Sequence, residues 1–414
     1  MNHNALARGT LVIILGGGQG ERLYPLTRDR TKPAVPFGGG YRIIDFTLSN
    51  SINSGLKRVY VLTQYKSISL DRHLRMGWNC LHEEFGEFIV SVPPQQRMGE
   101  RWYEGTADAI YQNIYTLEQE RPDRVLILAG DHVYKMNYLD MLAFHEEKGG
   151  EITVGCAEVP VADGRRLGVM AADEDMRIRN FEEKPDEPNP MPGRPDVCLG
   201  SMGIYVFNTS TLVHLVSEDA RQDTTHDFGT DILPRVIHDR PVYAFPFRDP
   251  KRQRSYWRDI GTVDAYWQAN MDLLEEVPEF DLCDADWPVW TYHGQDAPAR
   301  FISAGPDHAP GVAVNSIVAE GCVIRGAKVE RSVLAPRVVV DPGAEVTESI
   351  LMGRVTIGGN SRLRRTIVDK DVVIPPGVEI GWNAEADRRR FAVTDQGIVV
   401  VPKNVPPGPE FWAS

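Results

Sequence analysis

Leu11-Val-Ile-Ile-Leu-Gly-Gly-Gly-Gln-Gly-Glu-Arg-Leu23 is the stretch of sequence that decides the fold of this chain. Its first five residues are all apolar, and a glycine-rich segment follows directly. A short, continuously apolar run is typical of a strand that is buried on both faces. Glycines after such a strand let the backbone turn sharply and present its N–H groups to an anion. The stretch therefore predicts a buried strand and a phosphate-binding loop, with a simple strand-to-helix turn as the alternative.

The same pattern continues to about residue 275. Further apolar runs and segments of helical spacing alternate there: runs at 58–64, 124–129 and 151–159, helical spacing at 106–120 and 138–148. Buried strands separated by helices predict an α/β, Rossmann-like domain over residues 1–278, with a mostly parallel sheet covered on both faces. Ligands bind such sheets beyond the carboxyl ends of the strands. The glycine-rich loop and Asp131, which follows the run at 124–129, are therefore expected at one edge.

From about Pro298 small apolar residues recur at intervals of six, with Gly, Asn, Asp and Pro between them. The repeating positions are Ile317, Val323 and Val329; Val338, Ala344 and Ile350; Ile357 and Leu363; and Val368, Ile374 and Ile380. This hexapeptide period is the signature of a β-helix, in which each side of a triangular coil places one aliphatic residue inward. A β-sandwich is the alternative, but the period persists for more than 60 residues. We expect a left-handed parallel β-helix over residues 299–414, after a linker at 279–298.

Composition restricts the class of protein. The 414 residues carry a formal net charge of -13, whereas a nucleic-acid-binding surface normally shows a basic patch. The five cysteines contain no CxxC pair and are expected to be reduced thiols of a cytoplasmic protein. The apolar run at 11–15 is too short for a signal sequence or a membrane span. We therefore expect neither nucleic acid nor a membrane as a partner.

Several residues are suited to phosphates and a metal ion. Arg22 closes the glycine-rich loop and can make charge-assisted contacts with a phosphate. Lys32 is held in an extended segment by Pro33 and is a candidate second phosphate ligand, or else a solvated lysine. Asp131 at the end of a buried strand suits Mg²⁺, which prefers one or two carboxylates together with phosphate oxygens. Asp259 is its candidate partner, a turn-forming Asp131 is the alternative, and His132 is given no catalytic role.

Other motifs offer aromatic and polar groups. Trp102 and Tyr103 can stack on a base, just before a helix that we expect to be N-capped by Thr106; an aromatic pair packed against that helix is the alternative. Lys184, between Glu183 and Pro185, can clamp a sugar phosphate. Hydroxyl and carboxylate groups suited to a sugar follow in two further motifs, SMGIY at 201–205 and HDFG at 226–229. Taken alone, each of these is equally a turn or a solvated charge run.

In this order, the motifs resemble those of the bacterial ADP-glucose pyrophosphorylases, the glucose-1-phosphate adenylyltransferases, from about Leu11 to Val401. The individual motifs are weak, but the ordered set is specific: KPAVPFGG, YRIIDFTLSNSINSG, WYEGTADA, ILAGDHVYKM, HDFGTDILP and YWRDIGTVDAYW. The resemblance implies transfer of the adenylyl group of ATP to α-D-glucose 1-phosphate, giving ADP-glucose and pyrophosphate for glycogen biosynthesis. Such a reaction needs no protein nucleophile, because catalysis is positioning and charge neutralisation.

The resemblance also implies roles for residues of this chain. Asp131, Arg22 and Lys32 would be catalytic, and Asp131 and Asp259 would hold Mg²⁺. The residues implied on the ATP side are Gly16, Gly17, Gly18, Gln96, Trp102, Tyr103 and Gly105. Those implied for glucose 1-phosphate are Glu183, Lys184, Ser201, Tyr205, Asp227 and Trp257. A homotetramer, a sugar-phosphate activator and inhibition by AMP or phosphate are implied as well.

The chain departs from the family pattern at two places. Glu21 stands where the family usually has Thr, and a carboxylate beside a triphosphate is repulsive unless it points away or pairs with Arg22. Asp29 replaces a basic, activator-linked residue of the enteric type, and Pro36 replaces a polar residue of the same set. Arg30, Arg42 and Arg389, the last from the cluster at 388–390, remain candidates for an allosteric site.

Three alternatives stay open at this point. The same chemistry with UTP or dTTP is the nearest, although the segment at 102–109 favours adenine. A non-catalytic regulatory subunit is disfavoured because the phosphate-handling residues are all present. Hexapeptide β-helices also occur in acyltransferases, but the repeats from 312 to 381 contain no histidine on which such a site could be centred.

Overall fold

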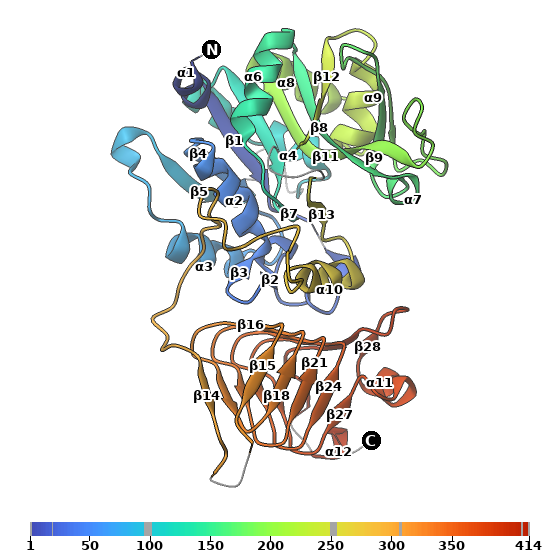
Figure 1. The fold of residues 1–414 in the computed structure, drawn as a ribbon. Helices are drawn as coiled ribbons and strands as arrows, with labels where there is room; N and C mark the ends of the chain where they lie inside the picture. The colour runs from blue at the N-terminus through green and yellow to red at the C-terminus, as the bar shows by residue number, and fades with distance from the viewer. Residues whose placement is uncertain are drawn as a thin grey trace.

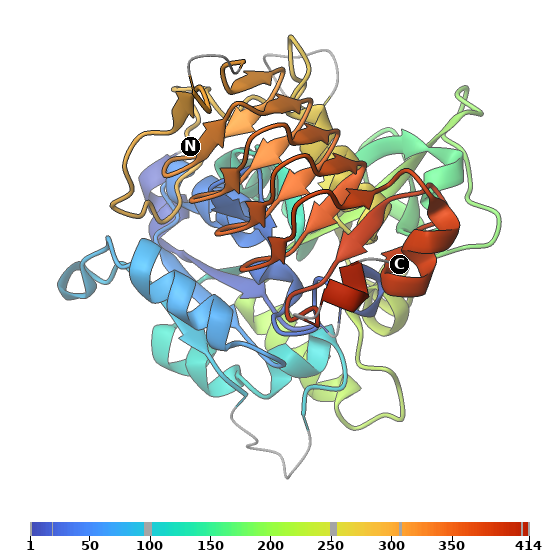
Figure 2. The ribbon, with the colours of Figure 1, turned by 90° about the horizontal axis from the view of Figure 1, so that it is seen from below.

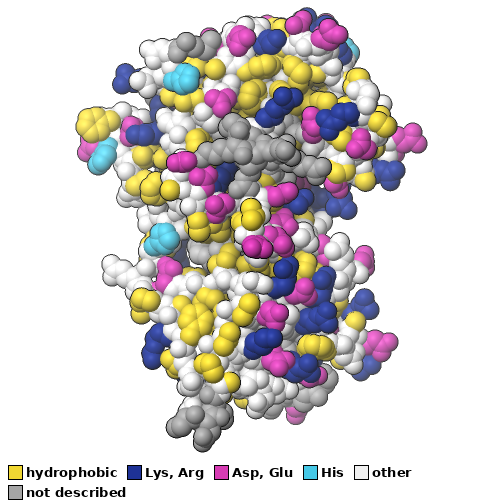
Figure 3. Space-filling view, viewed as in Figure 1, with side chains coloured by type: hydrophobic (Ala, Val, Ile, Leu, Met, Phe, Trp, Pro, Cys, Tyr) yellow, Lys and Arg dark blue, Asp and Glu magenta, His cyan; other side chains and the backbone are white. Residues whose placement is uncertain are grey.

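The computed structural model describes residues 2–18, 20–94, 102–248, 255–305, 309–406 and 409–412. Figure 1 shows two lobes, an α/β domain formed by the first part of the chain and a β-helix formed by the last. Helix α10 (Val263–Asp272) lies on the side of the α/β domain that faces the β-helix. On the face seen in Figure 3, acidic and basic side chains are mixed over both lobes.

A nine-stranded sheet forms the centre of the first domain. Strand β1 (Thr10–Leu15) lies between β4 (Arg58–Leu62) and β6 (Arg124–Ala129) and is parallel to both. The parallel half ends at β5 (Phe88–Val92), and β11 (Val197–Asn208) pairs antiparallel with β6 on the other side. The sheet is completed by β8 (Ile152–Pro160), β9 (Gly168–Ala172), β10 (Ile178–Glu183) and β12 (Val242–Pro246). The four strands predicted from apolar runs are thereby confirmed.

Alternate residues of β1 enter two separate hydrophobic cores. Leu11 and Ile13 join one cluster with α4 (Thr106–Tyr111), α5 (Ile114–Glu120), α8 (Thr209–Asp219) and α9 (Leu233–Val236). Val12 and Ile14 join the other with α1 (His3–Arg8), α2 (Ile43–Asn53), α3 (Ile68–Gly77) and α6 (Tyr138–Lys148). Helices therefore cover both faces of the sheet, and this is why every position of the run is apolar.

The helix predicted at 106–120 is interrupted between α4 and α5. At the break, Asn113 Nδ2 donates to the carbonyl oxygen of Ala109 at 2.8 Å and to Tyr103 Oη at 3.0 Å. An asparagine that bonds the backbone in this way competes with helical hydrogen bonding. The prediction of one continuous helix was wrong: α4 ends at Tyr111 and α5 begins at Ile114, and Asn113 lies at the break.

The second domain is a parallel β-helix with three sheets, and Figure 2 shows its coils stacked along one axis. The first sheet contains β14 (Arg300–Ile302), β17 (Val323–Arg325), β20 (Val339–Val340), β23 (Thr356–Ile357) and β26 (Val373–Ile374). The second contains β15 (Val312–Val314), β18 (Lys328–Glu330), β21 (Glu345–Thr347), β24 (Arg362–Arg364) and β27 (Glu379–Ile380). The third contains β16 (Ile317–Val318), β19 (Val333–Leu334), β22 (Ile350–Leu351), β25 (Thr366–Val368), β29 (Val399–Val401) and β28 (Ala392–Val393).

The coils differ from a strict hexad repeat in one respect. The first coil, in which Ile317 is the partner of Val333, takes 16 residues. The next coils take 17, because Val333 is the partner of Ile350 and Ile350 is the partner of Ile367. One side of the triangle is thus a residue shorter than the other two. Leu351 lies in the interior cluster of the β-helix, whereas its neighbour Ile350 packs in the cluster shared with the first domain. The period of six was a correct guide to the fold. It was wrong for Ile317 and Ile350, which it placed inside the coil although both pack in the cluster shared with the first domain.

The two domains share a hydrophobic core. Tyr266 and Trp267 of α10 belong to the same cluster as Ile350, Met352 and Ile367 of the β-helix. The segment between the domains is also anchored. Within it, Trp287 Nε1 donates to Asn50 Oδ1 at 2.8 Å, and the Trp290 amide donates to Ser49 Oγ at 2.8 Å. Residues 279–298 contain no helix or strand, but side chains of α2 hold them in place.

Candidate active site

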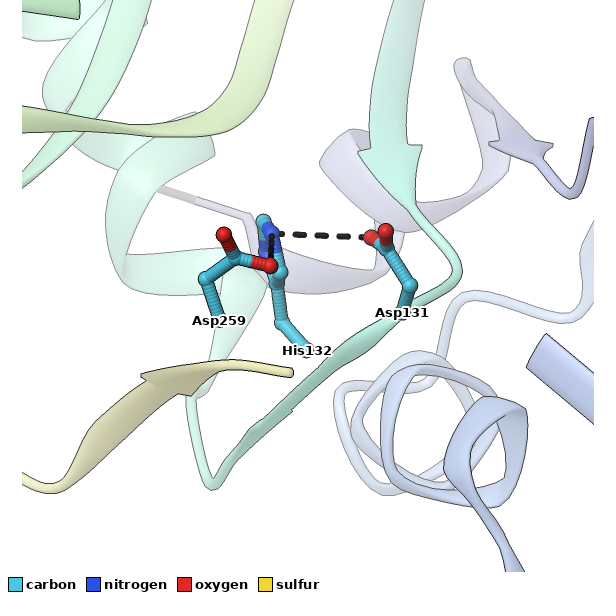
Figure 4. Close-up of side chains that lie close together, drawn as sticks. All are labelled: Asp131, His132 and Asp259. Carbon is cyan, nitrogen blue, oxygen red and sulfur yellow. Dashed lines mark ion pairs between the residues drawn. The ribbon is translucent and has the colours of Figure 1, made fainter. Parts of the chain in front are cut away.

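Two carboxylates and a histidine meet at the carboxyl end of β6. Asp131 lies in the corner between β6 and β7 (His132–Tyr134). Strand β13 (Trp257–Asp259) pairs antiparallel with β7, and this register places Asp259 opposite His132. Figure 4 shows the three side chains pointing toward one another. Strand pairing between distant segments therefore brings together the two carboxylates that the sequence proposed as metal ligands.

Lys32 bridges these two carboxylates. Its Nζ lies 2.5 Å from Asp131 Oδ2 and 3.1 Å from Asp259 Oδ1, and its side chain is 12% exposed. Burial alone would lower the pKa of Lys32, but Asp131 and Asp259 raise it above its ordinary value. Burial alone would raise the pKa of Asp131, but Lys32 and His132 hold it below its ordinary value. The site therefore contains one ammonium ion and an ionised Asp131 at neutral pH.

The donor set fits a divalent cation. One ligand atom from each of Asp131, His132 and Asp259 lies within 4.8 Å of the other two. His132 Nε2 is 3.5 Å from Asp131 Oδ1 and 3.8 Å from Asp259 Oδ1. Carboxylate oxygens are the ligands that hard cations prefer. No role was predicted for His132 from the sequence, although its position next to Asp131 was an available signal. Its ring packs edge-on against Trp257, with ring centroids 5.1 Å apart.

The glycine-rich loop begins where β1 ends. The Gly16 amide donates to the carbonyl oxygen of Leu62 at 2.8 Å, and Thr31 Oγ1 donates to the Gly16 carbonyl at 3.0 Å. A Cβ on Gly17 would come within 3.1 Å of Gln64 Cβ, whereas a Cβ on Gly18 would meet no atom of the described residues within 4 Å. The backbone at Gly18 is thus open to a ligand, while Gly16 is fixed to the sheet.

The arginine that follows the loop is available to a ligand. Arg22 is exposed and, among the described residues, makes no ion pair; it lines a cleft of about 1250 Å³ together with Trp257 and Asp259. Glu21 is also exposed, and no ion pair joins it to Arg22 in the described part of the chain. Glu21 therefore does not neutralise the arginine that the sequence proposed as a phosphate ligand.

The residues expected near adenine lie beside the start of α4. The ring of Trp102 is 46% exposed and stacks on Tyr65 with centroids 5.6 Å apart. The carbonyl oxygen of Tyr103 accepts a hydrogen bond from Gln64 Nε2 at 3.0 Å. Gln96 lies outside the described residues. The prediction that Thr106 caps this helix was wrong: Gly105 is the N-cap, and Thr106 is the first helical residue.

The residues expected around the sugar lie on four elements. Ser201 and Tyr205 are buried on β11, on either side of a break in its pairing with β8, and Asp227 begins the turn after α8. Burial, with smaller contributions from Asp227 and Glu183, raises the pKa of Tyr205, although Ser201 lowers it. Glu183 Oε1 lies 2.7 Å from the 59%-exposed Lys184. The structure thus gathers Glu183, Ser201, Tyr205 and Asp227, with Lys184 at the surface.

Two of the three candidate allosteric arginines are already engaged. Arg30 is 4% exposed, and its Nη2 lies 2.8 Å and 3.0 Å from the two carboxylate oxygens of Asp369. Arg42 Nη1 donates to Ser69 Oγ at 2.8 Å and to backbone oxygens. Arg389 is exposed on α11 (Ala384–Arg390), which packs against β28. The sequence could not show that the Arg30 guanidinium is already paired with a carboxylate of the other domain.

The sequence missed Lys370. Burial and repulsion from Arg42 and Arg30 lower the pKa of Lys370 to about 7. Its ammonium has no hydrogen-bond or ion-pair partner among the residues that the structure describes. A cation in this position is available to an anion, but no motif in the sequence distinguishes it from a surface lysine.

Comparison with known families agrees with this geometry. The family model described as "Nucleotidyl transferase" matches residues 11–276, and the one described as "GlmU-like, C-terminal hexapeptide" matches residues 297–401. A glucose-1-phosphate adenylyltransferase of Rhodopirellula baltica is 51% identical, covering 97% of this chain and 91% of its own length. The glucose-1-phosphate adenylyltransferases of Methylococcus capsulatus and Paramagnetospirillum magneticum are 51% and 49% identical. Each of these two matches covers 96% of this chain and 94% of the relative. The chain therefore belongs to the glucose-1-phosphate adenylyltransferase family of nucleotidyl transferases.

None of the described helices is both long and apolar enough to cross a bilayer.

Proposed function

We propose that this chain transfers the adenylyl group of ATP to α-D-glucose 1-phosphate, releasing pyrophosphate and forming ADP-glucose for glycogen synthesis. The observation that carries the proposal is Lys32 between Asp131 and Asp259, at the sheet edge where the glycine-rich loop begins. One ammonium ion and two carboxylates at a phosphate-type loop are the groups that phosphoryl chemistry requires. The names of the relatives and the family match support the same reaction.

The residues of this chain would act by position and charge. Asp131 and Asp259 would hold Mg²⁺, which, when bound, neutralises charge on the phosphate oxygens. Lys32 and Arg22 would bind the triphosphate, while the open backbone at Gly18 admits a phosphate to the loop. Lys184 would hold the phosphate of the sugar, so that one of its oxygens attacks the α-phosphorus of ATP in line as pyrophosphate leaves. Phosphate oxygen is the nucleophile, so no protein group forms a covalent bond.

A synthesis assay tests the proposal. The purified chain is incubated with glucose 1-phosphate, Mg²⁺ and each of ATP, UTP and dTTP, and pyrophosphate release is measured. We expect turnover with ATP to exceed that with the other nucleotides. A preference for UTP would reject the adenylyl assignment, and no turnover with any nucleotide would support a regulatory subunit.

We also propose an anion-binding regulatory site between the domains, centred on Lys370. Lys370 lies near enough to Arg42 and Arg30 for both to lower its pKa. A sugar phosphate, AMP or inorganic phosphate would neutralise this group of cations. Kinetic assays with fructose phosphates, AMP and phosphate test the site, and Lys370→Met should weaken any response while leaving unactivated turnover within about twofold. The homotetramer and the cytoplasmic location stay predictions.

A further inference from the structure

We propose that Thr106 is a positioning residue for the sugar side of the active site. Its hydroxyl fixes the carboxylate of Asp227 so that a single acceptor position, on Oδ2, remains for a sugar hydroxyl. The inference rests on the proposed function, because it assigns a role to Asp227 in binding glucose 1-phosphate. Thr106 itself would touch no substrate.

The backbones around Thr106 and Asp227 are in direct contact. A Cβ on Gly105 would lie 2.2 Å from the carbonyl oxygen of His226 and 2.3 Å from that of Thr225. The His226 carbonyl in turn accepts the Ala107 amide of α4 at 2.8 Å. Only glycine permits this approach, because any side chain at residue 105 would overlap the two carbonyl groups. The first turn of α4 is therefore docked on the residues that precede Asp227.

The hydroxyl of Thr106 has a defined direction. The Phe228 amide donates to Thr106 Oγ1 at 3.0 Å, and Thr106 Oγ1 lies 2.9 Å from Asp227 Oδ2. An amide can only donate, and an ionised carboxylate can only accept. The hydroxyl proton must therefore point at Oδ2. The Phe228 amide and the Asp227 carboxylate together therefore fix the orientation of the Thr106 hydroxyl.

The acceptor positions of Asp227 are nearly all used. Oδ1 accepts the amides of Gly229 at 2.9 Å and Thr230 at 3.1 Å, with the Thr230 hydroxyl at 3.4 Å. A carboxylate offers about four lone-pair positions, two on each oxygen. Oδ1 is thus saturated by the turn that follows. Within the ranges that the structure describes, only the Thr106 hydroxyl donates to Oδ2, which has one position left. A ligand hydroxyl can be accepted only there.

The turn that begins at Asp227 also contacts Glu183, the neighbour of the lysine that would bind the sugar phosphate. A Cβ on Gly229 would lie 2.6 Å from Glu183 Oε2, so the backbone of the turn touches that carboxylate directly. Glu183 is paired with Lys184 at 2.7 Å. Thr106 thereby connects α4, which follows Trp102 and Tyr103, to the turn that supports Glu183 and Lys184.

Substitution of Thr106 tests the role. Thr106→Val keeps the shape and removes the hydroxyl, Thr106→Ser keeps the hydroxyl, and Thr230→Val is a matched control because its hydroxyl lies on the saturated Oδ1. We expect Thr106→Val to raise the KM for glucose 1-phosphate at least tenfold, roughly the effect of one charged hydrogen bond. The KM for ATP should change less than about threefold. Thr106→Ser and Thr230→Val should stay within about twofold of the parent for both substrates.

Deoxy-glucose 1-phosphates add a readout that a purely structural role would not move. The parent enzyme should discriminate against the analogue that lacks the hydroxyl bound by Asp227, and Thr106→Val should lose that discrimination. Equal rises in KM for both substrates, or failure of Thr106→Ser to restore the parent values, would overturn the inference. If Thr106→Val does not fold, as judged by circular dichroism, Thr106→Ala replaces it.

Asp227→Asn separates this inference from the proposed function. If the parent enzyme makes no ADP-glucose, the proposed function fails and the inference fails with it. If Asp227→Asn leaves the KM for glucose 1-phosphate unchanged in an active enzyme, the sugar role of Asp227 is rejected although the reaction stands. If Asp227→Asn raises that KM and Thr106→Val does not, only the role of Thr106 is rejected.

Discussion

Arg30 of the first domain and Asp369 of the β-helix form an ion pair that is almost completely buried, with side chains 5% and 3% exposed. Arg30 Nη2 lies between the two carboxylate oxygens, and Arg30 Nη1 is 3.7 Å from Met352 Sδ. Lys32 follows only two residues later and reaches Asp131. The pair therefore ties the segment that carries Lys32 to the β-helix.

Breaking this pair should destabilise the protein. Asp369→Leu leaves the Arg30 guanidinium buried without its partner, and such losses cost about 3–5 kcal/mol. The double variant Arg30→Met with Asp369→Leu removes both charges and should recover most of that loss. Thermal unfolding followed by circular dichroism measures both effects. A double variant no more stable than Asp369→Leu would contradict the assignment of the loss to a buried charge.

Removal of a metal-site carboxylate should stop the reaction. Asp131→Asn keeps the volume of the side chain but removes a negative charge from the site, so we expect turnover to fall at least about 100-fold. Chelation by EDTA should abolish the activity of the parent enzyme, and Mg²⁺ should restore it. Calorimetric titration with Mn²⁺ provides a readout independent of turnover, and unchanged binding in Asp131→Asn would reject its role as a ligand.

Substitution by alanine should have different effects at two glycines. Gly18→Ala places a methyl group where no atom from the described part of the chain lies within 4 Å, so the melting temperature should not change. The methyl group would obstruct a phosphate in the loop, and the KM for ATP should rise about tenfold. Gly105→Ala would collide with the His226 carbonyl and should lower the melting temperature. If Gly18→Ala binds ATP normally, the phosphate does not approach the backbone at that residue.

Lys184 should affect one substrate more than the other. Lys184→Gln removes the ammonium that is paired with Glu183 at the surface, and we expect the KM for glucose 1-phosphate to rise at least about tenfold through the loss of a charge-assisted contact. The KM for ATP should stay within about threefold. Steady-state kinetics at saturating concentrations of the second substrate measure both constants. Equal changes would exclude a sugar-phosphate clamp.

The buried ammonium of Lys370 should make stability depend on pH. The pKa of Lys370 is about 7 in the folded protein and about 10.4 in the unfolded chain. Burial and repulsion from Arg42, Arg30 and Arg354 lower it, and together they outweigh the attraction of Asp369. Folding therefore disfavours the charged form, and the resulting destabilisation grows as pH falls from about 10 to 7 and is constant below that. Lys370→Met should raise the melting temperature more at pH 7 than at pH 9.5.

The same titration should govern anion binding between the domains. Sulfate is a suitable probe because its charge is constant over this range. We expect sulfate to raise the melting temperature more at pH 6 than at pH 8.5, since Lys370 is protonated only at the lower pH, and Lys370→Met should reduce the difference. An identical pH dependence in Lys370→Met would show that another group controls binding.

The sequence by itself determined the elements of this protein. Continuous apolar runs indicate strands that are buried on both faces of a sheet, and a period near six indicates the sides of a β-helix coil. Both patterns are local, because they follow directly from which side chains avoid water. For the same reason the glycine-rich loop after β1 and Asp131 after β6 could be placed at one sheet edge. Family resemblance added the roles of the residues.

Only the tertiary structure decided which distant groups meet. The pairing of β13 with β7 brings Asp259 to Asp131. The docking of α4 places the Thr106 hydroxyl against Asp227. At the domain interface, Arg30 forms an ion pair with Asp369. These contacts join segments far apart in the chain, so no local period encodes them. They depend on how whole elements pack, because a buried charge or hydroxyl must find its partner wherever packing places it.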